Sequence, residues 1–321
     1  MKSVHWPYNM RTIDENTITD AVLQQMASTE NARLQEIMAA AVRHLHAFAR
    51  EVDLTPEEWL DGIGFLTAIG QKCSPVRQEF ILLSDTLGLS SLVNSLNDQR
   101  VLRDRPAAAT ETKSSLLGPF YRHGSPSLEY GQSVALKKPG NEIAIYGRIQ
   151  DSDGQGIANA TIEVWQTDDG GLYDTQRYGG SEMDMRGTFH SDSEGRYCLR
   201  TVWPLGYSIP MDGPVGDLIR AQRRHGMRPA HTHFLISAPG YRELVTALYM
   251  GDDKYIDSDT VFGVTDSLVK EPAPGDSSSP FPALPSICHD FVLAATGKDT
   301  KSGRVGADPS QFIKHPAETA H

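Results

Sequence analysis

Apolar and polar residues follow two different periods along this chain. Between residues 17 and 52 apolar side chains recur every three or four positions, at Leu34, Ile37, Met38, Ala41, Val42, Leu45 and Phe48. This spacing predicts an amphipathic helix. A second helix is expected to open at Thr55 and Pro56 with Glu58 as capping residue, and a third to run from Ser74 to near Gly88. The first hundred residues are therefore predicted to be mostly helical.

After Lys113 the pattern changes to short alternating or β-branched runs. Strands are predicted at 142–149, 160–166, 196–203, 231–237 and 243–250, with turn sequences such as DSDGQG between them. Segment 271–285 is too rich in Pro and Ser for regular structure, and a last strand is expected within 289–295. The pattern predicts an α+β protein: a helical domain (1–112), an antiparallel β-sandwich (113–298) that carries the chemistry, and a polar tail (299–321).

Composition and charge limit the classes of function. The formal net charge of −11 over 321 residues argues against nucleic-acid binding, which requires clustered Lys and Arg in excess. The three cysteines show no CxxC spacing, so neither a disulfide framework nor a thiolate zinc site is indicated. No apolar run approaches the roughly 20 residues of a membrane span, and the first residues do not resemble a signal peptide. We expect a cytoplasmic protein with a small-molecule partner.

Two histidines in one predicted strand are the first candidates for chemistry. His231 and His233 in RPAHTHF point to the same face, because side chains alternate across a strand. His44 and His46 have the same spacing on a helix, where they face different directions and cannot share an ion. No carboxylate closely follows His233, as a ferrous facial triad would favour. A catalytic zinc with a distant third histidine, His190 or His225, is the main alternative at this point.

Tyr173 in GGLYDTQ and Tyr207 in WPLGYSIP are further oxygen donors, each in a loop after a strand. Together with the histidines they lie within blocks GPFY, EVWQTDDGGLYD, GRYCLRTVWPLGY, RHGMRPAHTHF and GDDKY. These blocks, in this order over residues 20–295, resemble the intradiol ring-cleavage dioxygenases. The resemblance is closest to the members that act on hydroxyquinol.

The resemblance implies a metal site and a reaction. One Fe(III) per chain would be held by Tyr173, Tyr207, His231 and His233. Phenolates suit this hard cation, because the metal takes the place of the phenol proton. An aromatic diol or triol would displace Tyr207, which becomes the proton acceptor, and O2 would cleave the ring between the hydroxylated carbons. Arg228 corresponds to the arginine that stabilises charge on the substrate.

The substrate pocket implied by the resemblance has ten residues: Leu82, Asp85, Leu116, Leu117, Gly118, Pro119, Phe120, Ile209, Pro210 and Val261. Asp85 lies three positions after Leu82, on the same helix face. Its carboxylate offers an acceptor for the third hydroxyl of hydroxyquinol (1,2,4-trihydroxybenzene), a group that catechol lacks. We therefore expect hydroxyquinol, plain or chlorinated, as substrate, with catechol or chlorocatechol as the alternative.

The family is typically a homodimer joined through its helical domains, with a tunnel there for an amphipathic lipid. The apolar face of residues 34–48 is compatible with such an interface, and equally with packing inside one chain. A zinc hydrolase and a non-catalytic binding sandwich are the alternatives from other classes. The iron hypothesis predicts a red to burgundy protein, whereas a zinc enzyme would be colourless.

Overall fold

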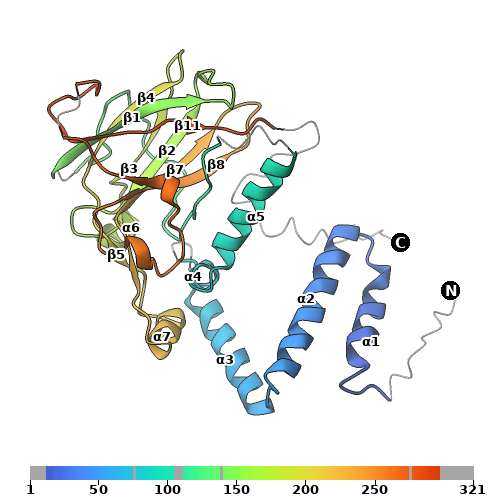
Figure 1. Cartoon of the computed structure of the whole chain (residues 1–321). Coiled ribbons are helices and arrows are strands. Elements are labelled where there is room, and N and C mark those ends of the chain that lie inside the picture. Colours follow the sequence, from blue (N-terminus) through green and yellow to red (C-terminus); the bar gives the residue numbers. More distant parts are fainter. Residues whose placement is uncertain (1–11, 75–76, 105–110, 138–139, 275–276, 297–321) are drawn as a thin grey trace, which may run out of the picture. The chain divides into compact units, whose positions relative to one another are not determined.

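The structure is a computed structural model that describes residues 12–74, 77–104, 111–137, 140–274 and 277–296 (Figure 1). The helices are α1 (Ile18–Gln25), α2 (Ala32–Glu51), α3 (Pro56–Lys72), α4 (Glu79–Thr86), α5 (Leu89–Asp104), α6 (Asp174–Tyr178) and α7 (Pro214–Ala221), with short 3-10 turns η1 (Met26–Ser28), η3 (Ile256–Ser258) and η4 (Asp266–Leu268). The strands are β1 (Glu142–Gln150), β2 (Thr161–Gln166), β3 (Arg186–His190), β4 (Arg196–Val202), β5 (Tyr207–Ser208), β6 (Met227–Arg228), β7 (His231–Ser237), β8 (Leu244–Met250), β9 (Val269–Lys270), β10 (Ser286–Cys288) and β11 (Phe291–Val292). Helices followed by a sheet-rich region confirm the predicted α+β class.

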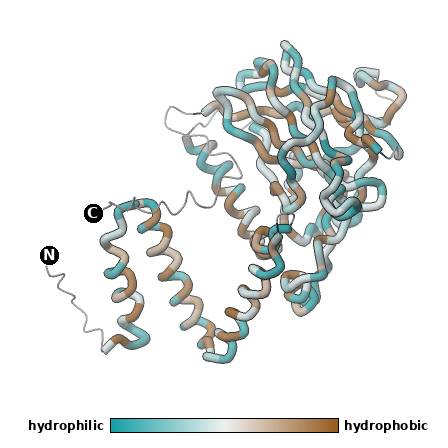
Figure 2. Tube along the Cα trace, turned by 180° about the vertical axis from the view of Figure 1, so that it is seen from behind, coloured by the Kyte–Doolittle hydropathy of each residue, from teal (hydrophilic) through white to brown (hydrophobic). Residues whose placement is uncertain are grey.

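The chain divides into two compact units between Thr67 and Ala68, within α3. In the first unit α1 contacts α2, where the Thr19 hydroxyl lies 3.0 Å from His46 Nδ1. Hydrophobic and hydrophilic residues alternate along α2 (Figure 2), and its apolar side chains Ile37 and Phe48 are exposed. The domain boundary at residue 112 stays a prediction, and the tail 299–321 lies outside the described residues. No helix in the described part of the chain is long and apolar enough to span a membrane.

The helix ends follow local capping chemistry. At the start of α3 the Thr55 N–H donates to Glu58 Oε2 (3.0 Å), and the Glu58 N–H donates to Thr55 Oγ1 (3.2 Å), which confirms the predicted capping box. The expected helix start at Ser74 is wrong, because Ser74 closes a turn with Arg77 and α4 begins only at Glu79. After α4 the chain turns through Gly88 with φ of +75°, a conformation that glycine tolerates best.

The strands form two sheets and a short hairpin. In one sheet β1 pairs with β4, β10 and β11, and the other has the order β3-β2-β7-β8-β9, while β5 pairs with β6. The prediction of a strictly antiparallel sandwich is wrong in this detail, because β10 and β11 run parallel to β1, and β9 runs parallel to β8. These three strands have two or three residues each. Long connections precede β9 and β10 and bring the chain back in the same direction, and β11 follows β10 closely along β1.

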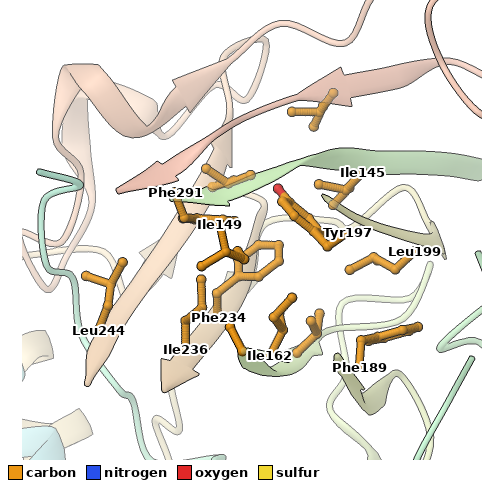
Figure 3. Close-up of a cluster of buried hydrophobic side chains, with 14 of the residues drawn as sticks. Ile145, Ile149, Ile162, Phe189, Tyr197, Leu199, Phe234, Ile236, Leu244 and Phe291 are labelled. Carbon is orange, nitrogen blue, oxygen red and sulfur yellow. The ribbon is translucent and has the colours of Figure 1, made fainter. Parts of the chain in front are cut away.

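The core lies between the two sheets. Ile145, Ile149 and Leu199 of one sheet meet Ile162 and Phe234 of the other, all fully buried (Figure 3). Alternation along each strand sends these side chains inward. On β7 the apolar Phe234 and Ile236 belong to this core, so the histidines at the alternate positions point to the opposite face of the sheet.

Candidate functional site

The two histidines of β7 lie side by side with their Nε2 atoms 3.0 Å apart. His231 Nδ1 lies 2.7 Å from the carbonyl oxygen of Pro229, so Nδ1 carries the proton and Nε2 is unprotonated. Burial is the main factor that lowers the pKa of both imidazoles well below the ordinary value, and both are therefore neutral. Two nitrogen ligands that each lie about 2.1 Å from one ion, at right angles to each other, are about 3 Å apart. The separation of the two neutral Nε2 atoms therefore suits the binding of a single ion by both imidazoles.

Trp165 and Gly118 fix the position of His233. The indole ring of Trp165 stacks on the imidazole with centroids 4.8 Å apart and an interplanar angle of 7°. Trp165 and His233 are direct partners in the β2–β7 pairing, which explains why they meet. On another side a Cβ at position 118 would lie 3.6 Å from the imidazole, and Gly118 adopts φ of +71°. The backbone of the predicted pocket segment therefore runs against this candidate ligand.

The two tyrosines converge on the histidines from separate loops. Tyr173 caps the start of α6 and is fully buried, and its ring meets that of Tyr207 edge to face at 5.2 Å. Tyr207 opens β5 and lies 5.7 Å from the His231 ring, centroid to centroid. Burial, followed by the nearby Tyr207, raises the pKa of Tyr173, whose hydroxyl has no well-formed hydrogen bond within the described residues. A buried phenol oxygen that lacks a well-formed hydrogen bond, and whose polar neighbour is the Tyr207 hydroxyl, fits a position that a cation would occupy.

A buried ion pair anchors the Tyr173 loop. Asp174 follows Tyr173 directly, and its carboxylate accepts two hydrogen bonds from Arg186, one of them from Nε at 2.7 Å. Arg186 Nη2 also donates to the carbonyl oxygen of Phe120 at 3.2 Å. The Phe120 ring stacks on Tyr173 with centroids 4.3 Å apart. One guanidinium therefore holds both the candidate ligand loop and the aromatic ring packed on it.

Arg228 stands beside the histidines in the β5–β6 hairpin, opposite Tyr207 in the register. Its Nη1 lies 3.2 Å from His231 Nε2, and the side chain is buried. The guanidinium is paired with Asp259, at 3.1 Å from Nε to Oδ1 and 3.2 Å from Nη2 to Oδ2. Burial alone would lower the pKa of Arg228, but Asp259 and the neighbouring tyrosines keep it raised, so the positive charge is retained.

The predicted pocket residues are partly gathered in one cavity. A cavity of about 330 Å³ is lined by Leu82, Pro119, Phe120 and Pro210, together with Arg77, Gln78, Glu79, Thr175, Gln176 and Asp212. Leu117 packs on the cluster of Phe120, Trp165, Tyr173 and Tyr207. Asp85, Ile209 and Val261 are buried but do not line that cavity, and Leu116 lines a second cavity of about 230 Å³.

The alternative zinc site does not form around the histidine pair. His190 and His225 are both exposed, and no group of three His, Cys, Asp or Glu residues suited to a metal occurs in the described part of the chain. Asp259, Tyr249 and Trp165 were missed from the sequence. Of these only Trp165 had a usable signal, since it stands in the EVWQ strand that pairs with HTHF.

Comparison with known proteins decides the family. The family model described as "Dioxygenase" matches residues 116–295, and the model "Catechol dioxygenase N terminus" matches residues 31–104. The chain belongs to the intradiol ring-cleavage dioxygenases. The family assignment from the sequence motifs is thus confirmed, and this dioxygenase is an enzyme.

The relatives of the enzyme cover nearly its whole length. It is 45% identical over 287 residues to a 6-chlorohydroxyquinol 1,2-dioxygenase of Cupriavidus pinatubonensis, which covers 89% of this chain and 100% of that protein. It is 41% identical over 288 residues to a hydroxyquinol 1,2-dioxygenase of a Rhizobium species, with 87% and 95% covered. The crystal structure of hydroxyquinol 1,2-dioxygenase from Pseudomonas putida superposes with a TM-score of 0.76 at 42% identity, over 88% of this chain and 99% of the other.

Proposed function

We propose that this enzyme cleaves hydroxyquinol, plain or chlorinated, between its adjacent hydroxylated carbons with O2, giving a hydroxymuconate or its tautomer maleylacetate. The observation that carries the proposal is the buried cluster in which Tyr173, Tyr207, His231 and His233 converge. The relatives named for hydroxyquinol and chlorohydroxyquinol support the choice of substrate. Catechol or chlorocatechol is the alternative substrate.

The cofactor of the proposed site is one Fe(III) per chain, held by the two tyrosines and the two histidines. Two phenolates and two neutral imidazoles suit a hard trivalent cation, because the phenolates balance most of its charge. The neutral histidines and the Tyr173 hydroxyl, which is buried without a well-formed hydrogen bond, support this donor set. When bound, ferric iron supplies a Lewis acid that withdraws electron density from the substrate ring and makes it reactive toward O2.

Tyr207 and Arg228 have the active roles in the proposed reaction. Tyr207 would be one of the residues that hold the iron, and its phenolic oxygen would accept a proton from a substrate hydroxyl. Arg228 faces the same region from β6 and stabilises the negative charge that develops on the substrate ring. Its burial strengthens this effect, since water does not screen the guanidinium.

Asp85 is the proposed selector of the third hydroxyl. Its side chain is buried on α4, and burial is the main factor that raises its pKa. The closeness of Arg228 lowers that pKa and the closeness of Asp259 raises it, which places Asp85 in the electrostatic surroundings of the site. A hydrogen bond with Ser90 also lowers the pKa of Asp85, and a hydroxyl donor from the substrate would add a further hydrogen bond that catechol cannot supply.

Oxygen uptake tests the substrate. We expect Asp85→Asn to lower kcat/KM for hydroxyquinol by roughly 10 to 100-fold, as for loss of a hydrogen bond to a charged group, and to leave catechol turnover nearly unchanged. Asp217→Asn, at an exposed aspartate of α7, is the control and should match wild type. A preference for catechol in wild type, or no change on substitution of Asp85, would refute the assignment of hydroxyquinol.

The visible spectrum tests the metal site. Iron-replete protein should absorb in the visible range by charge transfer from tyrosinate to ferric iron and contain about one iron per chain. Tyr207→Phe should shift this band and abolish most turnover. A colourless protein with full iron, or full activity after that substitution, would contradict the ligand assignment.

We further propose a cytoplasmic homodimer, joined through its helices and able to hold an amphipathic lipid there.

A further inference from the structure

We propose that Asp259, supported by Tyr249, is a positioning residue that aims the Arg228 guanidinium at the reacting substrate. This inference rests on the proposed function, because it concerns how the charge-stabilising arginine is held. Asp259 lies in the segment after η3, far from the ligand motifs in the sequence, and its side chain and that of Arg228 are each 3% exposed.

The carboxylate of Asp259 occupies one edge of the guanidinium. Its Oδ1 accepts from Arg228 Nε at 3.1 Å, and its Oδ2 accepts from Nη2 at 3.2 Å. This two-point contact fixes the plane of the guanidinium, since both bonds must lie in it. The remaining terminal nitrogen, Nη1, is left on the other edge, 3.2 Å from His231 Nε2. The free edge of the charge thus faces the candidate metal ligands.

Tyr249 adds a third contact, because its hydroxyl lies 3.3 Å from Arg228 Nη2. That hydroxyl donates to the carbonyl oxygen of Gly263 (3.0 Å) and meets the Ser115 hydroxyl at 2.9 Å. Its orientation is therefore set by two separate segments.

The Asp259 carboxylate is itself rigidly held. It accepts hydrogen bonds from the backbone N–H groups of Gly263 (3.0 Å) and Val261 (3.3 Å). Space around it is minimal, since a Cβ at position 263 would lie 2.9 Å from Arg228 Nη2 and 3.2 Å from Asp259 Oδ2. A carboxylate fixed by the backbone can transmit that rigidity to a long side chain that would otherwise sample many rotamers.

Without Asp259 the guanidinium would keep its charge but lose its direction. A buried arginine without its partner turns toward the nearest anionic oxygen, which in the proposed enzyme belongs to a tyrosinate or to the substrate. Asp259→Asn should therefore lower kcat and kcat/KM together, by roughly 10 to 100-fold, as expected when a transition-state contact is misaligned. The iron content and the visible band of the resting protein should stay as in wild type, because Asp259 contacts none of the four candidate ligands by hydrogen bond.

A double-mutant cycle with Arg228→Gln separates positioning from simple structural support. If Asp259 acts through Arg228, Asp259→Asn should change kcat by less than about 2-fold once Arg228 is already glutamine. An equal loss in both backgrounds would overturn the inference. Asp257→Asn is the matched control, because Asp257 is an exposed carboxylate in the same turn and should leave kcat unchanged.

Thermal unfolding provides a readout that does not depend on turnover. Each single variant should lower the melting temperature, since it leaves a buried charge without its partner, and the double variant should recover part of the loss. Additive losses would contradict the pairing. If Asp259→Asn does not fold, Tyr249→Phe replaces it in the cycle. It should lower kcat several-fold with Arg228 present and leave kcat unchanged with Arg228→Gln, and equal losses overturn the inference.

The outcomes also separate this inference from the proposed function. A wild-type protein without the visible band and without oxygen uptake would refute the proposed function before any variant is compared. A coloured, active wild type whose Asp259→Asn variant keeps full kcat would refute the positioning role alone.

Discussion

Replacing Asp174 with asparagine should destabilise the enzyme and weaken metal binding at the proposed iron site at the same time. The side chains of Asp174 and Arg186 are 0% and 1% exposed, so the carboxylate is the main compensation for a guanidinium without water. Removing one partner of such a buried pair typically costs about 3–5 kcal/mol, because the other charge stays buried. For a unit of this size that corresponds to a fall in melting temperature of roughly 6–15 °C. Asparagine keeps the shape of aspartate and one acceptor oxygen. The loss of stability therefore reports mainly on the missing negative charge.

The metal site should respond because Asp174 adjoins Tyr173 in the chain. Loss of a group that orients a ligand typically weakens metal binding by about 10 to 100-fold, which competition with a chelator would measure. Asp217→Asn is the matched control, since the Asp217–Arg220 pair is exposed at both ends and such surface pairs contribute about 1 kcal/mol or less. Equal melting temperatures for the Asp174 and Asp217 variants would refute the argument from burial.

Two further predictions concern pH and backbone space. Burial lowers the pKa of His289 to about 4, so the imidazole stabilises the fold above pH 6.5 and this contribution is lost progressively between pH 6.5 and 4. The free energy of unfolding should therefore fall by about 2 kcal/mol less between pH 7 and pH 5 in His289→Gln than in wild type, as measured by denaturant titration. His44→Gln, at an exposed histidine, is the control and should behave like wild type. Gly206→Ala should lower activity at least 10-fold, because its Cβ would lie 2.6 Å from Asp253 Oδ2 and 2.9 Å from the carbonyl oxygen of Arg228, so the backbone next to Tyr207 has to shift. An alanine variant with wild-type colour and turnover would show that the loop relaxes instead.

Elements with a sustained period could be predicted from the sequence, whereas of the three parallel strands only β11 falls within a predicted range, 289–295. Strands β1, β2, β4, β7 and β8 have six to nine residues and agree with their predicted ranges to within one residue. The parallel strands β9, β10 and β11 have two or three residues each, too few to show any alternation. The direction of these strands depends on which strand of the sheet the chain pairs with when it returns. That choice is made by tertiary packing and leaves no local pattern in the sequence.

The same limit explains which parts of the site could be predicted. His231 and His233 share a face by strand geometry alone, and the tyrosines stand in motif blocks, so these four could be proposed from the sequence. Asp259 lies in YIDSDTVFG, where Asp257 two positions earlier looks equivalent, yet Asp257 is exposed and Asp259 is buried. No local pattern separates the two carboxylates, because the difference arises from the approach of Arg228 from a distant hairpin.

This arrangement of charges bears on the choice of substrate. Asp259 accepts hydrogen bonds from two guanidinium nitrogens of Arg228, so the positive charge of Arg228 is paired mainly with the Asp259 carboxylate. Asp85 is buried in the same surroundings, but it makes no ion pair with Arg228. Burial therefore dominates and raises its pKa, which means that the ionised form lacks full compensation. Ser90 compensates part of this charge through a hydrogen bond, and in the proposed function a substrate hydroxyl that donates to Asp85 would compensate more of it, which catechol cannot do. The proposed preference for hydroxyquinol thus rests on how the guanidinium of Arg228 is shared between the two carboxylates.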